Sequence, residues 1–240
     1  MSLSPTAMDP EQFFADVIAD VTIEMDDIVT AQTLKRKREL YSQVEKLVGL
    51  GYQEASGRPA QNFRTAALAL MDGIMTTSKE NFLFVVPFGL VPLKFQFAAI
   101  VGDARKAGCN CRIAPDSVKL WDTDDRIPTS APYLVSNIAV SKYERTFPDD
   151  RIREIKNRGR LPLTLAEFLM AIVRFPKQIR HRSLIAGSRY GNGATVPCVW
   201  FFDKEPMIDF CELRESYAVK KRVEKFAIPH CARRTFIQSR

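Results

Sequence analysis

The 240-residue chain has few histidines and lacks the spacings that metal sites usually require. His181 and His230 are its only histidines, and no Cys-x-x-Cys pair occurs among its five cysteines. Histidine-based catalytic triads and most zinc sites need more than this. We therefore expect no metal site and no cofactor. The cysteines are interpreted as buried thiols. The alternative is a metal site around Cys109 and Cys111 that Cys198, Cys211, His230 and Cys231 complete in three dimensions.

The chain also lacks a long apolar run. The most apolar region, residues 82–101, is interrupted by Pro87, Pro92, Lys94 and Gln96. A membrane-spanning helix needs about 18 or more consecutive apolar residues, so no membrane segment is expected. The N-terminus has no basic start or apolar middle of a signal peptide, which predicts a cytoplasmic protein with reduced thiols.

Acidic residues are abundant where basic residues are missing. The first 32 residues hold seven of the 28 acids and none of the 35 bases, although the whole chain carries a net charge of +7. The remaining residues are therefore strongly basic. This asymmetry indicates an acidic segment that lies on a basic surface or competes for it, and a solvated acidic helix is the simpler interpretation.

The acidic segment has the pattern of an amphipathic helix. Asp9-Pro10 is typical of a helix start, and Phe14, Val17 and Val21 then fall on one face. We predict an acidic amphipathic helical extension over residues 1–33, which is a candidate for homo-oligomer contacts. Residues 34–240 contain no linker or repeat and are predicted to form a single α+β domain.

The periodicity of the domain predicts an α+β fold: N-terminal helices, a mixed sheet with a buried central strand near 81–87, and a C-terminal β-hairpin region. Helices are expected at residues 34–48, 59–70, 92–106, 148–159 and 164–176. The last of these begins with a capping box, Thr164 to Glu167. Strands are expected at residues 118–121, 133–140, 183–188 and 195–202, the last two joined by a turn at residues 190–193.

Two groups of residues are candidates for binding an anion. Ser188 and Arg189 lie in the glycine-containing stretch 187–193, where backbone amides and a guanidinium can hold a carboxylate or phosphate. Arg153, Arg158 and Arg160 lie in a basic segment and can follow a phosphate backbone. A hairpin turn and a solvated helix face are the simpler interpretations of the two stretches.

Several short motifs resemble an uncharacterised bacterial family, domain of unknown function 5701. They are YSQVEKLVGLGY at 41–52, FVVP at 84–87, APYL at 131–134, GRLPLT at 159–164, AGSRYG at 186–191 and VPCVW at 196–200. The resemblance covers about residues 40–210. It implies a shared fold and supplies no catalytic residues.

The function is therefore unknown from the sequence, and two hypotheses stay open. The first is a non-catalytic cytoplasmic interaction protein whose basic face binds an acidic protein or nucleic acid. The alternative is a small-molecule-binding protein or enzyme with a site near residues 187–193 and the carboxylates Asp122, Asp124 and Asp125.

Overall fold

A computed structural model gives the fold, and it describes residues 27–71, 81–102, 111, 120–141, 144–145, 148–175, 179, 181–213 and 225–237. The chain divides into two compact units, residues 1–36 and residues 37–240. The predicted acidic extension over residues 1–33 lies almost entirely outside the described residues. The sheets, the core and the candidate site all belong to residues 37–240.

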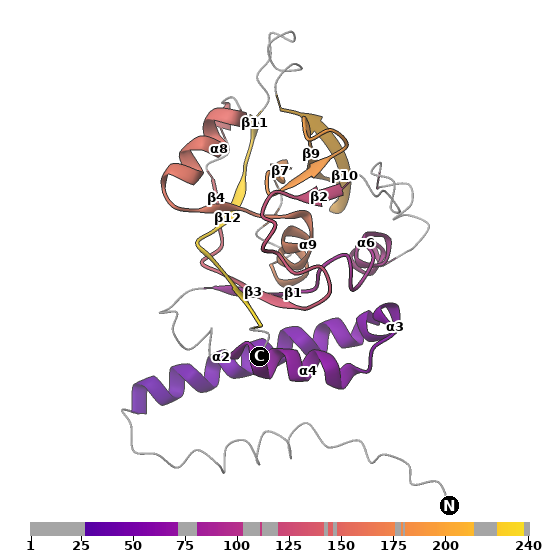
Figure 1. The fold of residues 1–240 in the computed structure, drawn as a ribbon, viewed down its shortest axis with the longest axis vertical. Helices are drawn as coiled ribbons and strands as arrows, with labels where there is room; N and C mark the ends of the chain where they lie inside the picture. Colours follow the sequence, from indigo (N-terminus) through magenta and orange to yellow (C-terminus); the bar gives the residue numbers. More distant parts are fainter. Residues whose placement is uncertain are drawn as a thin grey trace, which may run out of the picture. The chain divides into compact units, whose positions relative to one another are not determined.

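The described residues form six helices and thirteen strands, which confirms the α+β class (Figure 1). The helices are α2 (Asp27–Gly49), α3 (Tyr52–Ser56), α4 (Ala60–Ala69), α6 (Leu93–Val101), α8 (Pro148–Asn157) and α9 (Leu165–Arg174). The strands up to α9 are β1 (Phe82–Val85), β2 (Leu120–Asp122), β3 (Tyr133–Ser136), β4 (Ala139–Val140), β5 (Glu144–Arg145) and β6 (Leu161–Pro162). The later strands are β7 (Ser183–Leu184), β8 (Ser188–Tyr190), β9 (Thr195–Phe202), β10 (Glu205–Glu212), β11 (Lys225–Phe226), β12 (Pro229–Cys231) and β13 (Arg233–Phe236).

The strands pair in small antiparallel sheets. The orders are β1-β3-β13, β10-β9-β8-β2 with β7 also on β9, β4-β12-β6, and β11-β5. Parallel contact in the described residues is limited to the isolated bridges Cys111–Ile208 and Ser183–Ala227. The predicted mixed sheet is therefore replaced by several small antiparallel sheets, and many of the paired strands are far apart in the sequence, as β3 and β13 are.

Strand β1 is fully buried, as predicted, but it is an edge strand rather than a central one. In its described sheet β3 pairs with both β1 and β13. The open edge of β1 is covered by the buried side chain of Gln43 in α2. Its Nε2 donates to the carbonyl of Phe82 at 3.2 Å, and its Oε1 accepts from the amide of Phe84 at 2.9 Å. The amide side chain thus replaces a neighbouring strand, which is how an edge strand can be buried.

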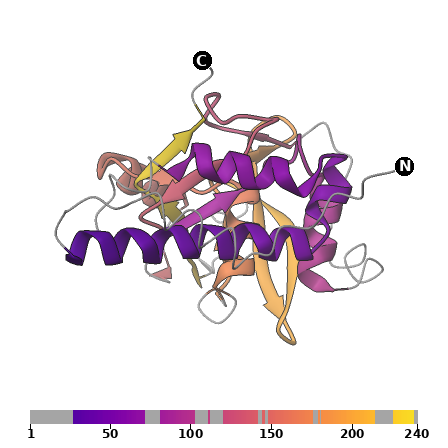
Figure 2. The same cartoon turned by 90° about the horizontal axis from the view of Figure 1, so that it is seen from below.

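Helices α2 and α4 cover the β1–β3 face of the core (Figure 2). Leu40, Val44 and Leu47 of α2 recur at helical spacing and are all buried in this main cluster. Phe63 and Ala67 of α4 join them. The predicted helices at 34–48 and 59–70 are therefore confirmed, although α2 begins earlier, at Asp27.

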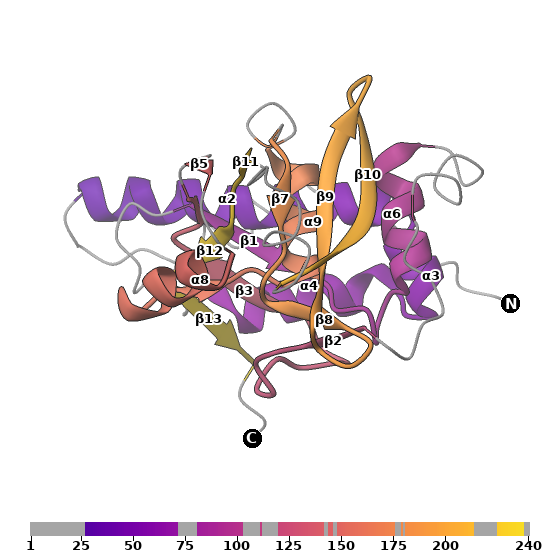
Figure 3. The same ribbon diagram turned by 90° about the horizontal axis from the view of Figure 1, so that it is seen from above.

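The C-terminal hairpin region is confirmed, and so is the predicted turn. Strands β7 and β8 pair antiparallel with β9 across residues 191–194, where Gly191 and Gly193 have positive φ angles. A second, longer hairpin joins β9 and β10 through Asp203 and Lys204, whose φ angles are 48° and 70° (Figure 3). Two adjacent residues with positive φ are typical of the turn that suits the twist of a hairpin.

A second, smaller core lies under α8. Ile152 and Ile155 of α8 pack with Val196 and Cys198 of β9 and with Ile228. This packing leaves charged side chains of α8 such as Asp150 and Arg153 exposed on the other side of the helix, as expected for an amphipathic surface helix.

Candidate functional site

The arginines predicted to bind anions in and just after α8 already have acidic neighbours. Arg153 pairs with Asp150, and Arg158 pairs with Glu154, which also binds Arg151 at 2.6 Å. The Arg153 and Arg158 side chains are 69% and 70% exposed, so each pair contributes at most about 1 kcal/mol. A phosphate would have to compete with carboxylates of the same helix, which favours a solvated, charge-balanced face.

Arg160 points into the fold and does not join the exposed arginines. Its Nε donates to Nδ1 of His230 at 2.6 Å, and its Nη2 donates to the backbone carbonyl of Asn137. Burial and the charges of Arg160 and Arg158 lower the pKa of His230 to about 4. The imidazole is therefore neutral at pH 7, and its Nδ1 accepts a hydrogen bond from Arg160, which links the start of β6 to β12.

Ser188 and Arg189 of β8 are occupied by contacts within the fold. The fully buried Ser188 hydroxyl donates to Oδ1 of Asp122 at 2.6 Å and accepts from the amide of Leu165 at 2.9 Å. Arg189 Nη1 donates to the carbonyls of Ala186 and Ser188 at 2.6 and 3.0 Å. The structure thus brings residues 187–193 and the carboxylate of Asp122 together, but Ser188 is closed to a ligand.

Burial raises the pKa of the Asp122 carboxyl to about 6, and the hydrogen bond from Ser188 opposes this rise. An acid of this pKa suits proton transfer near neutral pH. Its partner Ser188 is buried and also accepts from the Leu165 amide, so the Asp122–Ser188 pair links β2 and β8 to the N-terminus of α9.

A buried ion pair lies beside Asp122. Glu167 of α9 is 0% exposed and binds Arg234 of β13, which is 4% exposed, through Nε at 2.6 Å and Nη2 at 2.9 Å. The same carboxylate accepts from the Thr164 amide and the Tyr133 hydroxyl at 2.7 and 3.2 Å. Arg234 also contacts Asp124 at 3.2 Å. Every oxygen of Glu167 is satisfied, so this cluster holds α9, β3 and β13 together.

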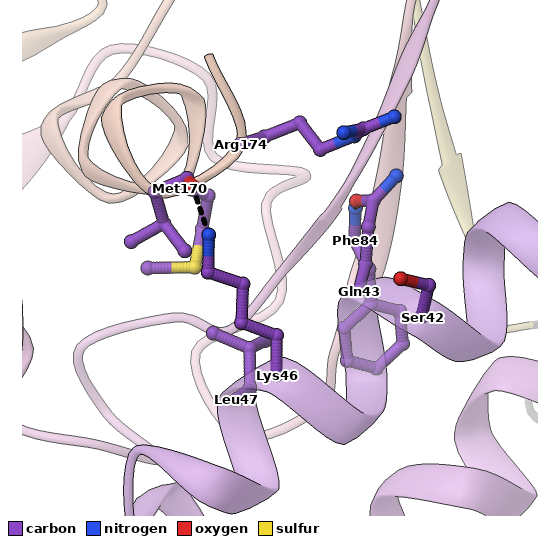
Figure 4. A pocket seen from close by; sticks show the side chains of 8 residues that line it. Ser42, Gln43, Lys46, Leu47, Phe84, Met170 and Arg174 are labelled. Atoms are coloured by element: carbon purple, nitrogen blue, oxygen red, sulfur yellow. Dashed lines mark hydrogen bonds between the residues drawn. The ribbon is translucent and has the colours of Figure 1, made fainter. Parts of the chain in front are cut away.

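A cavity of about 170 Å³ lies between α2, α9 and β1, and we call it the α2–α9 groove (Figure 4). It is lined by Ser42, Gln43, Lys46, Leu47, Phe84, Met170, Val173 and Arg174. Lys46 Nζ donates to the Val173 carbonyl at 2.6 Å, near the C-terminus of α9. Arg174 pairs with Glu39 at 2.7 Å. The lining holds two cations and no carboxylate.

The sequence did not identify the groove or the Glu167–Arg234 pair. The capping box that contains Glu167 was visible and is confirmed, since Thr164 accepts from the Glu167 amide. Lys46 lies next to the buried Leu47 in a helical pattern, but no local signal connects it with α9, more than a hundred residues later.

Among the described residues, no three metal-ligating side chains lie together, and none of the helices is long and apolar enough to cross a membrane. The predicted absence of a metal and of a cofactor stays a prediction.

Comparison with known proteins identifies a family. The family described as "Family of unknown function (DUF5701)" matches residues 46–206, about two thirds of the chain. This confirms the resemblance carried by the short motifs between residues 41 and 200. No curated protein and no solved structure matches the chain.

Proposed function

Since the chain belongs to the family of unknown function DUF5701, we propose a function from its own site: a non-catalytic cytoplasmic interaction protein that binds an acidic side chain of a protein partner in the α2–α9 groove. The observation that carries the proposal is the groove lining, which holds Lys46 and Arg174 beside apolar side chains and includes no acidic residue, although the carboxylate of Glu39 binds Arg174 from outside the lining.

The size of the groove favours a side chain over a metabolite. Small-molecule sites are usually about 300–1,000 Å³, and a cavity of about 150 Å³ holds a benzene molecule. A groove of about 170 Å³ therefore fits a group the size of a glutamate side chain. Leu47, Phe84 and Met170 supply apolar contacts for its methylene groups.

The charges of the groove favour an acidic group. Lys46 uses one ammonium proton for the Val173 carbonyl, and an ammonium group has three donors. Arg174 is held by Glu39 at the rim. A carboxylate that enters the groove can accept from Lys46 and share Arg174 with Glu39.

The other candidates have weaker support. Nucleic-acid binding through α8 must displace the acids that pair with Arg153 and Arg158. A small-molecule site near residues 187–193 must use a serine that is fully buried and has both a donor and an acceptor partner.

The test is fluorescence anisotropy with a fluorescently labelled hexaglutamate peptide, measured at low and at physiological salt. Lys46→Gln and Arg174→Gln should each weaken binding about two- to fivefold, since exposed ion pairs contribute up to about 1 kcal/mol. The matched control is Arg153→Gln, which removes the same charge from an exposed helix outside the groove. The melting temperature of each variant checks that the fold is intact.

An equal loss of peptide affinity in Arg153→Gln would show that net charge alone attracts the peptide, and the groove would not be the binding site. A labelled single-stranded oligonucleotide is the competing probe. If it binds more tightly than the peptide and responds only to Arg153→Gln and Arg158→Gln, the partner is nucleic acid and the proposal is wrong.

A further inference from the structure

Two cysteines lie on the same face of the β9–β10 hairpin. Cys198 of β9 stands opposite Asp209, and Cys211 of β10 stands opposite Val196. Since side chains two residues apart on a strand share a face, both thiols point to the side that packs in the smaller core. Cys198 is fully buried, whereas Cys211 is half-buried.

One guanidinium serves both sulfur atoms. Arg182 donates from Nε to the Cys198 sulfur at 3.3 Å and from Nη2 to the Cys211 sulfur at 3.4 Å. Its backbone carbonyl accepts from the Ala227 amide at 2.9 Å, which fixes the arginine beside the hairpin. A guanidinium keeps its charge at any ordinary pH and can only donate. The arrangement therefore stabilises negative charge on the sulfur pair.

The two thiols share that charge unequally. The hydrogen bond from Cys198, helped by Arg182, lowers the pKa of Cys211 to about 7 in spite of burial. The hydrogen bond to Cys211 and burial raise the pKa of Cys198. When the pair ionises, the proton leaves Cys211, the more accessible of the two, and the S–H group of Cys198 donates to the resulting thiolate.

From this geometry we propose that Cys211 is a reactive thiol that hydroperoxides oxidise to a sulfenic acid, with Arg182 and Cys198 as positioning residues. The Cys211 sulfur attacks one peroxide oxygen, and an S–O bond forms as the O–O bond breaks. Sulfur gains a hydroxyl group and is oxidised. The peroxide is reduced, and its second oxygen leaves as hydroxide, or as an alkoxide from an organic hydroperoxide, and takes a proton from the buffer to give water or an alcohol.

The register of the hairpin favours a sulfenic acid that persists. Cys198 and Cys211 are diagonal neighbours, for which Cα atoms are typically about 7–8 Å apart. Disulfides usually need Cα atoms about 4.4–6.8 Å apart, so closing one here requires the strands to shift. We expect the oxidised protein to gain one oxygen atom at Cys211.

The first experiment measures the pH dependence of alkylation by iodoacetamide, with each cysteine followed by mass spectrometry in the folded full chain. At pH 7 a thiol of pKa about 7 is about half ionised, against about 3% for an ordinary thiol of pKa ~8.5. A less basic thiolate is a weaker nucleophile, so the net advantage in rate is about threefold. The midpoint of the pH profile, about 1.5 pH units lower than usual, is therefore the decisive readout.

Variants separate the contributions. Arg182→Gln and Cys198→Ala should each move the Cys211 midpoint toward ~8.5, whereas Cys198→Ser, which keeps a hydrogen-bond donor, should leave it lower than Cys198→Ala does. Cys111 and Cys231 of the same molecule are the internal controls. Cys231 is fully buried, and burial raises its pKa to about 12, so it should stay unmodified.

The second experiment adds hydrogen peroxide and traps sulfenic acid with dimedone. A dimedone adduct on Cys211, in larger yield than on Cys111, supports the proposal. A midpoint of 8.5 or above in the unsubstituted protein, or no adduct on Cys211 after peroxide, overturns it. Neither result depends on a variant that could misfold, and neither bears on peptide binding in the α2–α9 groove.

Discussion

The buried pair of Glu167 and Arg234 gives the sharpest test of what holds this fold together. Glu167→Gln keeps the size of the side chain and removes the charge that faces Arg234 through two hydrogen bonds. Arg234 then keeps Asp124 at 3.2 Å and the Pro162 carbonyl at 2.9 Å as partners, and Asp124 is already shared with Arg126. A positive charge that is 4% exposed would be incompletely compensated.

The expected cost is about 3–5 kcal/mol, the usual penalty for removing one partner of a buried ion pair. The remaining contact with Asp124 places our expectation at the lower end of that range. In a domain of about 200 residues, each kcal/mol lowers the melting temperature by about 2–4 °C. Glu167→Gln should therefore melt roughly 6–12 °C below the unsubstituted protein.

A double-mutant cycle isolates the pair from its surroundings. Arg234→Met leaves Glu167 with only the Thr164 amide and the Tyr133 hydroxyl. The double variant carries neither charge of the pair. Its loss of unfolding free energy should therefore be about 1–3 kcal/mol smaller than the sum of the losses in the two single variants. Urea denaturation followed by the fluorescence of Trp121 and Trp200 gives all four free energies. A loss below about 1 kcal/mol in Glu167→Gln, or additive single losses, would refute this reasoning.

Three further substitutions test other parts of the fold. Gly187→Ala should destabilise by more than about 2 kcal/mol, because a Cβ would lie 2.5 Å from the backbone of residues 162–163. Gly49→Ala, with open space around it at the end of α2, should be neutral or stabilising by up to about 1 kcal/mol in the same denaturation assay, since alanine favours a helix more than glycine does. Gln43→Leu leaves two buried backbone groups of β1 unpaired, so the Phe84 amide should exchange its hydrogen faster and stability should fall by about 2 kcal/mol. Asp122→Asn should stabilise the fold by up to about 3 kcal/mol at pH 7 and by little at pH 4. The reason is that the pKa of Asp122 is raised in the folded protein, so ionisation of this carboxyl lowers the stability of the fold as pH rises from about 4 to about 6. An unchanged pH profile of unfolding would contradict this.

The sequence predicts the elements of this fold where local chemistry determines them. The capping box at Thr164 fixes the start of α9, and the apolar periodicity of residues 40–47 fixes the buried face of α2. The glycines at 191 and 193 gave the turn signal of the first hairpin, and both have positive φ angles in the structure. The second turn, between β9 and β10, was missed, because Asp203 and Lys204 adopt positive φ angles there without a glycine to mark them.

The anion candidates show which contacts a sequence can reveal. The spacings Asp150–Arg153 and Glu154–Arg158 place acid and base on one helix face, so these pairs could have been inferred once a helix was predicted. The partner of Arg160 is 70 residues away, at His230, and no local pattern indicates it. A count of bases along the chain therefore overstates the free positive charge of residues 148–160.

The closing strands lie beyond the segment that the family match covers. Residues 46–206 match the family, yet β13 pairs with β3, and Arg234 of β13 neutralises the buried Glu167 inside the matched segment. His230 and Cys231 of β12 likewise pair with Pro162 and Leu161 of β6. A protein cut after residue 213 would leave the carboxylate of Glu167 without its counter-ion and β3 with an unpaired edge. The physical domain therefore extends to the end of β13, and any study of the α2–α9 groove or of Cys211 needs these strands.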